Sequence, residues 1–540
     1  MDLNVFTELK EEASKNRGDC RFRVVLRGEY EYDAAREISN SYVDRLPAAV
    51  AFPRTARHVQ KCIQFCIDRN KFFRLRSGGH QHEGMSSLDD GLMIRLSEMC
   101  LIEFDDSSEE EAWIDTGMKL GQVYTELHRR GQIIPGGGCF TVNVGGLTQG
   151  GGWGLHARKH GLTCDSVRAV EVVLYDHETG RTAVETITPE HRSELLRALR
   201  GGGGGNFGVV TRFKFRLAEI PKELVVFRLG WRADQAETVA KVWLEVQDRF
   251  PDELTSFVRM GVMENGAPSA ADPQARDFPI YAGGLFYGSA EELWKLPAMR
   301  EFLERTKPAQ IDTPIEQGLH PGVSPNGEDK TLEPPDLFGY DDFTPASIAP
   351  RSDSFCDVAP PSVNCDRPHP HKVSSAFPTG EGEEFRDQIA TAVADYLNQS
   401  RHDPNVRSYM TFHAMGGAIS RAPSESSCFA YRDKAFLLQF QSWWNKARDS
   451  SCEKVMKERQ ERAIEWVRDF RETLNRKGLV EGAFINFVDK NLPVESTACA
   501  EKRLELLRYY YADELPFLRG VKREVDPSDV FKFEMSIPPA

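Results

Sequence analysis

Three glycine clusters between residues 136 and 154 constrain this chain of 540 residues more than any other feature. The clusters are Gly136–Gly138, Gly145–Gly146 and Gly150–Gly152, and a further glycine follows at position 154. Glycine at this density destabilises the interior of a helix or strand, because it loses the most backbone entropy on ordering. Apolar side chains interrupt the clusters and argue against a flexible linker: Val142, Val144, Leu147 and Trp153. We therefore expect this backbone to wrap against a large planar or phosphate-bearing ligand.

Two further glycine loops follow predicted secondary structure. A predicted strand over 72–75 leads into Arg76-Ser77-Gly78-Gly79-His80, where paired glycines let backbone N–H groups approach a ligand such as a pyrophosphate. A predicted helix that begins at Thr188-Pro189 ends in five consecutive glycines, Gly201–Gly205. Neither loop has the spacing of a Walker loop or of GxGxxG, so the sequence does not indicate a P-loop or Rossmann fold.

The elements around these loops predict an α+β region over residues 20–217, with strands and a capped helix at 48–52, 55–67, 169–175 and 209–215. Residues 227–286 alternate strands with a helix over 236–250, which predicts a sheet with helices on one face. Twelve of the thirty prolines lie in 308–370, which predicts a weakly ordered insertion. A later amphipathic helix is expected over 453–477.

Composition excludes several classes of function. The formal net charge of −14 and the pI near 5.5 argue against nucleic acid or anionic lipid as a partner. No apolar run reaches the roughly 18 residues of a membrane helix, and the first residues lack the pattern of a signal peptide. The eleven cysteines contain no CxxC pair and no zinc-like spacing. We expect a cytoplasmic enzyme without a metal site.

Six ordered segments match one known pattern: RSGGHQHEGMSS (76–87), GGCFTVNVGGLTQGGGWG (137–154), HGLTCDSV (160–167), LRGGGGGNFGVVTRF (199–213), FINFVD (484–489) and VKREVDPSDVFKFEMSIPP (521–539). Together they resemble the berberine-bridge-enzyme-like branch of the vanillyl-alcohol-oxidase flavoprotein superfamily. The resemblance implies a PCMH-type FAD-binding domain over 1–217, with its core from about residue 45. It also implies a substrate domain over 218–484, with an antiparallel sheet covered by helices, and a C-terminal segment, 485–540, that returns to the FAD domain.

The resemblance also assigns roles around FAD. It implies bicovalent attachment, in which His80 bonds the flavin 8α-methyl and Cys139 bonds flavin C6; attachment through His80 alone and noncovalent binding are the alternatives. Two covalent links are expected to raise the reduction potential of the flavin. The other residues expected to contact FAD are Arg76, Ser77, Gly78, Gly79, Gly145, Gly146, Gly150, Gly154, Val209, Val210 and Asn486.

The sequence departs from the family pattern where a catalytic base is expected. Phe487 stands at the position of a tyrosine and Leu147 at that of a histidine. Gln439 stands at a catalytic-site position that often holds glutamate or glutamine. Neither phenylalanine nor glutamine can take a proton at neutral pH. The alternative candidates are His413, Tyr431 and Tyr409, and a hydride transfer that loses its proton to water needs no base.

The expected activity is a two-electron oxidation, or an oxidative cyclisation, of a small natural-product intermediate or sugar. In this interpretation O2 reoxidises the flavin. The alternatives are a flavin dehydrogenase with another electron acceptor and an FAD-containing cyclase that performs no redox chemistry.

Overall fold

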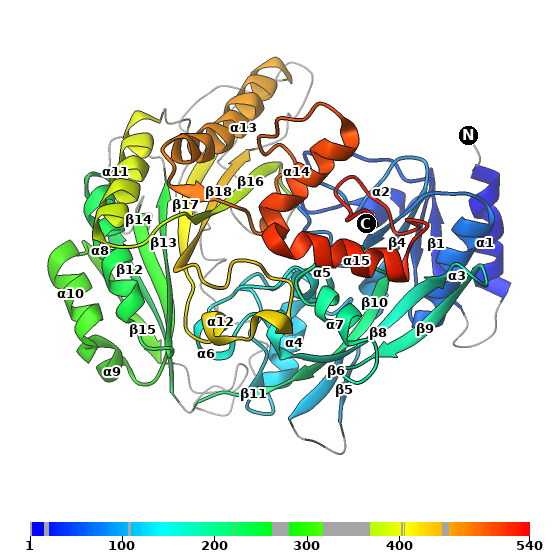
Figure 1. The fold of residues 1–540 in the computed structure, drawn as a ribbon, viewed down its shortest axis with the longest axis horizontal. Coiled ribbons are helices and arrows are strands. Elements are labelled where there is room, and N and C mark those ends of the chain that lie inside the picture. The colour runs from blue at the N-terminus through cyan, green and yellow to red at the C-terminus, as the bar shows by residue number, and fades with distance from the viewer. Residues whose placement is uncertain are drawn as a thin grey trace.

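The computed structural model describes residues 3–15, 21–105, 108, 110–221, 223–261, 280–316, 368–400, 403, 406–444 and 453–540. Residues 23–216 form two larger sheets at one end of the molecule, and an eight-stranded antiparallel sheet forms the other end (Figure 1). The C-terminal helices α14 (Cys499–Tyr511) and α15 (Leu515–Val525) lie between these ends. This arrangement confirms the predicted α+β fold class.

The N-terminal sheet has the strand order β1-β2-β4-β3. The loop Arg76–His80, called the first glycine loop below, lies at the end of β3. Its strands are β1 (Arg23–Leu26), β2 (Ala49–Phe52), β3 (Phe73–Arg76) and β4 (Leu92–Arg95), and its helices are α1 (Leu3–Lys15), α2 (Tyr32–Arg36) and α3 (Ala56–Asp68). Thr55 caps α3 as predicted, because its side chain accepts from the backbone N–H of His58. Cys62 and Cys66 pack in the core on the apolar face of this helix.

A five-stranded antiparallel sheet follows, with the order β5-β6-β10-β8-β9. Its strands are β5 (Ile102–Phe104), β6 (Glu111–Asp115), β8 (Val167–Asp176), β9 (Arg181–Ile187) and β10 (Val209–Arg216). The short elements between and after these strands are α4 (Leu120–His128), β7 (Gln132–Ile133), α5 (Val144–Gln149), α6 (Ala157–His160), α7 (Ser193–Leu199) and β11 (Ala218–Glu219). Gly136–Gly138 and Gly150–Gly152 lie in loops between these elements, whereas Gly145 and Gly146 lie in the short helix α5.

The large sheet has eight strands in the order β15-β12-β14-β13-β17-β18-β16-β19. They are β12 (Leu224–Trp231), β13 (Leu254–Gly261), β14 (Ile280–Tyr287), β15 (Gln310–Glu316), β16 (His371–Pro378), β17 (Val406–Ala414), β18 (Phe436–Trp444) and β19 (Val480–Glu481). One face carries the longer helices (Figure 1): α8 (Ala236–Val246), α9 (Ala290–Lys295), α10 (Pro297–Thr306), α11 (Glu383–Gln399) and α13 (Glu453–Arg476). The short α12 (Ala418–Arg421) follows β17.

Alternation along the strands gives this sheet two different faces. Val258, Phe412 and Leu438 pack in the core under the helices. Their neighbours along the same strands face the other way, and the strand register aligns a polar row across four strands: Arg259, Thr411, Gln439 and Ser375. A buried polar row is costly unless it serves a site or a network of partners. The polar face therefore marks where the sheet meets a ligand.

Two sequence predictions are wrong in their boundaries. The helix expected from Thr188-Pro189 begins at Ser193, because Thr188 and His191 instead close a tight turn through paired backbone hydrogen bonds. The insertion expected from residue 308 begins with the regular strand β15, which pairs with β12. The rest of the proline-rich prediction, residues 317–367, lies outside the described residues.

A fully buried lysine holds the C-terminal segment in place. Lys522 on α15 donates to Asp526 at 2.6 Å, to the carbonyl of Asn206 at 2.7 Å and to the carbonyl of Phe531 at 3.0 Å. Asn206 directly follows the glycine run Gly201–Gly205, so the ammonium of Lys522 joins α15 to this glycine run.

We expect Lys522→Met to lower the free energy of unfolding by about 3 kcal/mol, because it leaves the buried carboxylate of Asp526 uncompensated. Lys502→Met, on the exposed side of α14, is the matched control and should change stability by less than about 0.5 kcal/mol. Denaturant unfolding followed by tryptophan fluorescence measures both values. Equal stabilities of the two variants would contradict this role for Lys522.

Candidate functional site

A single large cavity brings the glycine loops together with the polar face of the large sheet. It encloses about 2250 Å³ of empty space, including its open mouth. The part of this space that a water-sized molecule can occupy is about 360 Å³, which lies within the roughly 300–1,000 Å³ of a ligand pocket. Its lining combines residues of the glycine loops with residues of the polar face of the large sheet.

The first glycine loop forms one wall. Ser77, Gly78, Gly79 and His80 line the cavity, and Ser77 donates its hydroxyl to the carbonyl of Thr116 at 2.7 Å. Gly79 has a φ of +81°, and a Cβ there would lie 2.6 Å from Nε of Arg76, so the turn requires glycine.

Arg76 does not contribute its side chain to this wall, contrary to the predicted contact with FAD. Its guanidinium turns toward α2 and donates to the carbonyl of Ala35 at 3.1 Å. Burial, with the nearby Arg95, lowers the pKa of Arg76 to about 9. Arg76 thus supports the loop from behind.

The glycine clusters between residues 136 and 154 form the floor of the cavity. Gly145, Gly146 and Gly150 line the cavity, as does the partly exposed Cys139. Gly154 lies outside the lining and packs against the loop itself, where a Cβ would meet the carbonyl oxygen of Gly136 at 1.8 Å. Gly154 thus has a packing role in the loop, and its contact with a cofactor stays a prediction.

Two residues of the lining have a buried amide oxygen without a hydrogen-bond partner among the described residues. Asn143 donates its Nδ2 to the carbonyl of Gly117 at 2.6 Å, and Gln149 donates its Nε2 to that of Gly145 at 3.0 Å. These bonds fix the orientation of each amide and leave Oδ1 of Asn143 and Oε1 of Gln149 unbonded. Buried acceptors without donors are costly, so these two atoms indicate a ligand with hydroxyl or N–H groups.

The far side of the floor is completed by residues from two distant segments. Val209 and Val210, at the start of β10, line the cavity together with Gly203, Gly204 and Gly205. Asn486 accepts from the N–H of Gly152 at 3.0 Å and donates to the carbonyl of Leu147 at 3.2 Å. Through these bonds Asn486 attaches the C-terminal segment to the glycine loops.

The part of the cavity next to the large sheet combines amide, phenol and aromatic groups. Gln439 lines it, beside Gln441, whose Oε1 accepts from both Tyr409 and Trp443 at 3.1 Å. Phe484, Phe487 and Leu147 add an apolar surface, and Arg259 adds a cation that lies 4.4 Å from the centre of the Tyr409 ring. This half suits a small molecule with both rings and polar substituents.

The structure does not bring the predicted bases His413 and Tyr431 into the lining. Nε2 of His413 lies 3.0 Å from Oε1 of Gln439 and therefore donates to it. Burial lowers the pKa of His413 to about 3. Tyr431 stacks on Phe377 and donates its hydroxyl to the carbonyl of Tyr509 at 2.7 Å, while burial raises its pKa. Both side chains support the site from behind, because each is already bonded to the protein.

Sequence reasoning missed several residues of the lining. His82 lies within the motif RSGGHQHEGMSS, two residues after His80, and its spacing was a usable signal. Gln441 and Trp443 lie on the same face of β18 as Gln439, because every second residue of a strand shares a face, so their spacing was a usable signal. Asn143 had no signal beyond its place between two glycine clusters.

Comparisons with known proteins agree with this geometry. A model of an FAD binding domain matches residues 47–182, and a model described as berberine and berberine-like matches 483–538. The uncharacterised FAD-linked oxidoreductase YgaK of Bacillus subtilis is 28% identical over 523 residues, covering 96% of this chain and 97% of its own. Berberine bridge enzyme-like 3 of Arabidopsis thaliana is 28% identical over 504 residues, covering 91% of this chain and 83% of its own.

The chain is an FAD-linked oxidoreductase that is similar to berberine-bridge-enzyme-like proteins along nearly its whole length. Solved structures share its fold. The wild-type BBE-like 1 of Physcomitrella patens aligns with a TM-score of 0.75 at 22% identity, covering 98% of this chain and 99% of that one. The glucooligosaccharide oxidase of Acremonium strictum aligns with a TM-score of 0.73 at 22% identity, covering 96% and 97%.

FAD fits the residues present. The loop Ser77–His80 offers backbone N–H groups suited to a pyrophosphate, and the unbonded oxygens of Asn143 and Gln149 suit the hydroxyls of a ribityl chain. When bound, FAD supplies acceptance of two electrons as a hydride. Within the described ranges, no three histidine, cysteine or acidic side chains lie together as a metal site, and no helix is long and apolar enough to cross a bilayer.

We expect Gly154→Ala to lower the free energy of unfolding by about 1–3 kcal/mol and to reduce the flavin-to-protein ratio, because the new methyl group forces two backbone segments apart. Gly520→Ala on α15, where a Cβ meets nothing within 4 Å, is the control and should be neutral or slightly stabilising. The ratio of absorbance at the flavin band to that of the protein band reports flavin content. A wild-type flavin-to-protein ratio in Gly154→Ala would show that the two backbone segments move apart without loss of flavin binding.

Proposed function

We propose that this enzyme is an oxidase whose FAD is attached covalently to both His80 and Cys139. The observation that carries the proposal is the position of both nucleophiles in the wall of one cavity that also reaches the polar face of the large sheet. The related glucooligosaccharide oxidase of Acremonium strictum has a 6-S-cysteinyl, 8α-N1-histidyl FAD, which supports the same chemistry here. Imidazole and thiolate are both nucleophiles able to attack an oxidised flavin ring.

The proposed reaction removes a hydride from a carbon next to oxygen or nitrogen in a small organic molecule, with O2 as the final acceptor. The apolar surface of Phe484, Phe487 and Leu147 favours a ring-bearing natural-product intermediate or a sugar. Gln439 and Gln441 offer hydrogen bonds that would orient its polar substituents. Matches to structures of chitooligosaccharide and xylooligosaccharide oxidases support the use of O2.

Acid precipitation tests the covalent links. We expect the wild-type pellet to stay yellow, and the single variants His80→Ala and Cys139→Ala each to retain flavin through the remaining bond. The double variant should release its flavin to the supernatant. Peptide mass mapping of the two segments locates each bond, and a colourless wild-type pellet would contradict covalent attachment.

Anaerobic mixing tests the reaction. We expect a substrate from a panel of sugars and phenolic or polyketide alcohols to bleach the flavin, and air to restore the colour with one H2O2 for each oxidised molecule. A flavin that bleaches but reoxidises only with an artificial acceptor would favour a dehydrogenase. Conversion of a substrate without bleaching would favour the non-redox cyclase.

A further inference from the structure

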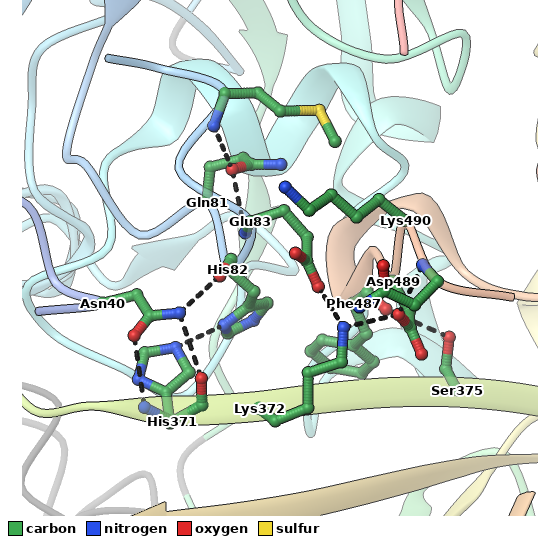
Figure 2. A network of polar contacts seen from close by, with 12 residues as sticks. Asn40, Gln81, His82, Glu83, His371, Lys372, Ser375, Phe487, Asp489 and Lys490 are labelled. Carbon is green, nitrogen blue, oxygen red and sulfur yellow. Dashed lines mark hydrogen bonds and ion pairs between the residues drawn. The ribbon is translucent and has the colours of Figure 1, made fainter. Parts of the chain in front are cut away.

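The partly exposed His82 and the buried His371 form a pair between the first glycine loop and the large sheet. Nδ1 of His82 lies 3.0 Å from Nε2 of His371, the first residue of β16 (Figure 2). Asn40 holds the two backbones together, because its Nδ2 donates to the carbonyls of both histidines while its Oδ1 accepts from the N–H of His371 at 3.1 Å. The pair is therefore fixed in position.

A backbone carbonyl sets the tautomers of both rings. Nδ1 of His371 lies 2.9 Å from the carbonyl oxygen of His369, which can only accept, so this nitrogen carries a proton. Burial lowers the pKa of both histidines, that of His82 to about 3, and both rings are neutral at ordinary pH. Nε2 of His371 is then an acceptor, and His82 must donate through Nδ1. Nε2 of His82 is left with a lone pair.

The lone pair on Nε2 belongs to a residue that lines the part of the cavity next to the large sheet. His82 lines the cavity and is partly exposed to it. Within the described part of the chain, the only hydrogen-bond partner of its ring is His371. The centre of its ring lies 6.3 Å from that of Phe487, the residue that replaces the expected tyrosine base.

We propose that His82 is the catalytic base of this enzyme, accepting the hydroxyl proton of the substrate at Nε2, and that His371 is a positioning residue that fixes its tautomer. This inference rests on the proposed oxidation and names the residue that replaces the missing phenol. It further specifies the substrate class as an alcohol, hemiacetal or phenol-bearing molecule whose hydroxyl meets His82.

The step balances for an alcohol. The O–H bond breaks and its proton forms an N–H bond at Nε2 of His82, while the adjacent C–H bond breaks and its electron pair leaves with the hydrogen as a hydride. Bound FAD would supply the acceptance of this hydride, and the carbon and oxygen left behind form a carbonyl. The imidazolium then releases its proton to solvent as the product leaves.

The low basicity of His82 is compatible with this role. A carbonyl that still carries the hydroxyl proton is a far stronger acid than an imidazolium, so a weak base accepts the proton once the hydride departs. The ionisable groups that face His82 are His80 on the same loop and His371 and Lys372 on β16. Lys372 is in turn paired with Glu83 and Asp489. Because these surroundings keep His82 neutral, we expect no ionisation of the base to limit flavin reduction between about pH 5 and 9.

Modification by diethyl pyrocarbonate tests the tautomer without any substrate. This reagent acylates unprotonated imidazole nitrogens, and peptide mass mapping of the flavin-loaded enzyme reports each site. We expect His82 to react at an unchanged rate from about pH 7 down to about pH 5, whereas exposed histidines slow below their ordinary pKa of about 6.5. His371 should stay unmodified. An unreactive His82, or one that slows like an exposed histidine, overturns the inference.

Flavin reduction in variants tests the chemistry, with the substrate found by the anaerobic screen. We expect His82→Gln to keep its flavin and its substrate affinity but to lose about 10²- to 10⁴-fold in the rate of reduction. His371→Gln should lose less and should also change the reactivity of His82 toward diethyl pyrocarbonate. His58→Gln, a buried histidine on α3 outside the cavity, is the matched control.

The outcomes separate this inference from the proposed function. A wild-type rate of reduction in His82→Gln overturns the base assignment and leaves the oxidase intact. Loss of rate in His413→Gln but not in His82→Gln moves the base to His413. A wild-type flavin that no compound bleaches, with His82 reactive as expected, overturns the oxidase proposal and the base assignment with it.

Discussion

The buried ammonium of Lys372 joins the three parts of the chain that build the site. It lies on β16 and is 2.5 Å from carboxylate oxygens of both Glu83, on the first glycine loop, and Asp489, in the C-terminal segment (Figure 2). All three side chains are less than a tenth exposed, so their charges have little access to water and depend on one another. Burial opposes the charge of Lys372, but the two carboxylates raise its pKa overall.

The neighbours of this cluster are the cavity residues themselves. Glu83 follows His82, Lys372 follows His371, and Asp489 lies two positions after Phe487. Alternation along β16 turns Lys372 and His371 to different sides of the chain, so one strand carries both the structural ion pair and the histidine contact. Because an unpaired ion in this interior costs several kcal/mol, the loop, the strand and the C-terminal segment hold one relative position, and the cavity keeps its shape.

The sequence predicted the local parts of this structure well. Glycine loops, a capped helix at Thr55 and the strand at 209 follow from backbone preferences that act over a few residues. The residues of the site that were missed depend on contacts between distant segments: His82 and His371 are 289 positions apart. The motif as a whole predicts Arg76 on the ligand side, yet its side chain bonds Ala35 on the opposite side of the loop. Spacing along the chain carries no information on such packing.

The same reasoning explains why the catalytic candidates chosen from sequence lie behind the lining. His413 and Tyr431 lie on the side of the sheet region that meets the glycine loops. Trp153 covers His413, with 4.5 Å between the two ring centres, and the hydroxyl of Tyr431 donates to the backbone carbonyl of Tyr509. A titratable side chain on the correct face is available for chemistry only where the opposing layer leaves it open. In this enzyme the opposing layer is open at Gln439 and Gln441 and at the loop residue His82. Because position 487 lacks the expected phenol, the proposed proton acceptor is instead His82 on the first glycine loop. Lys372 and Asn40 both hold this loop against the sheet and keep it rigid.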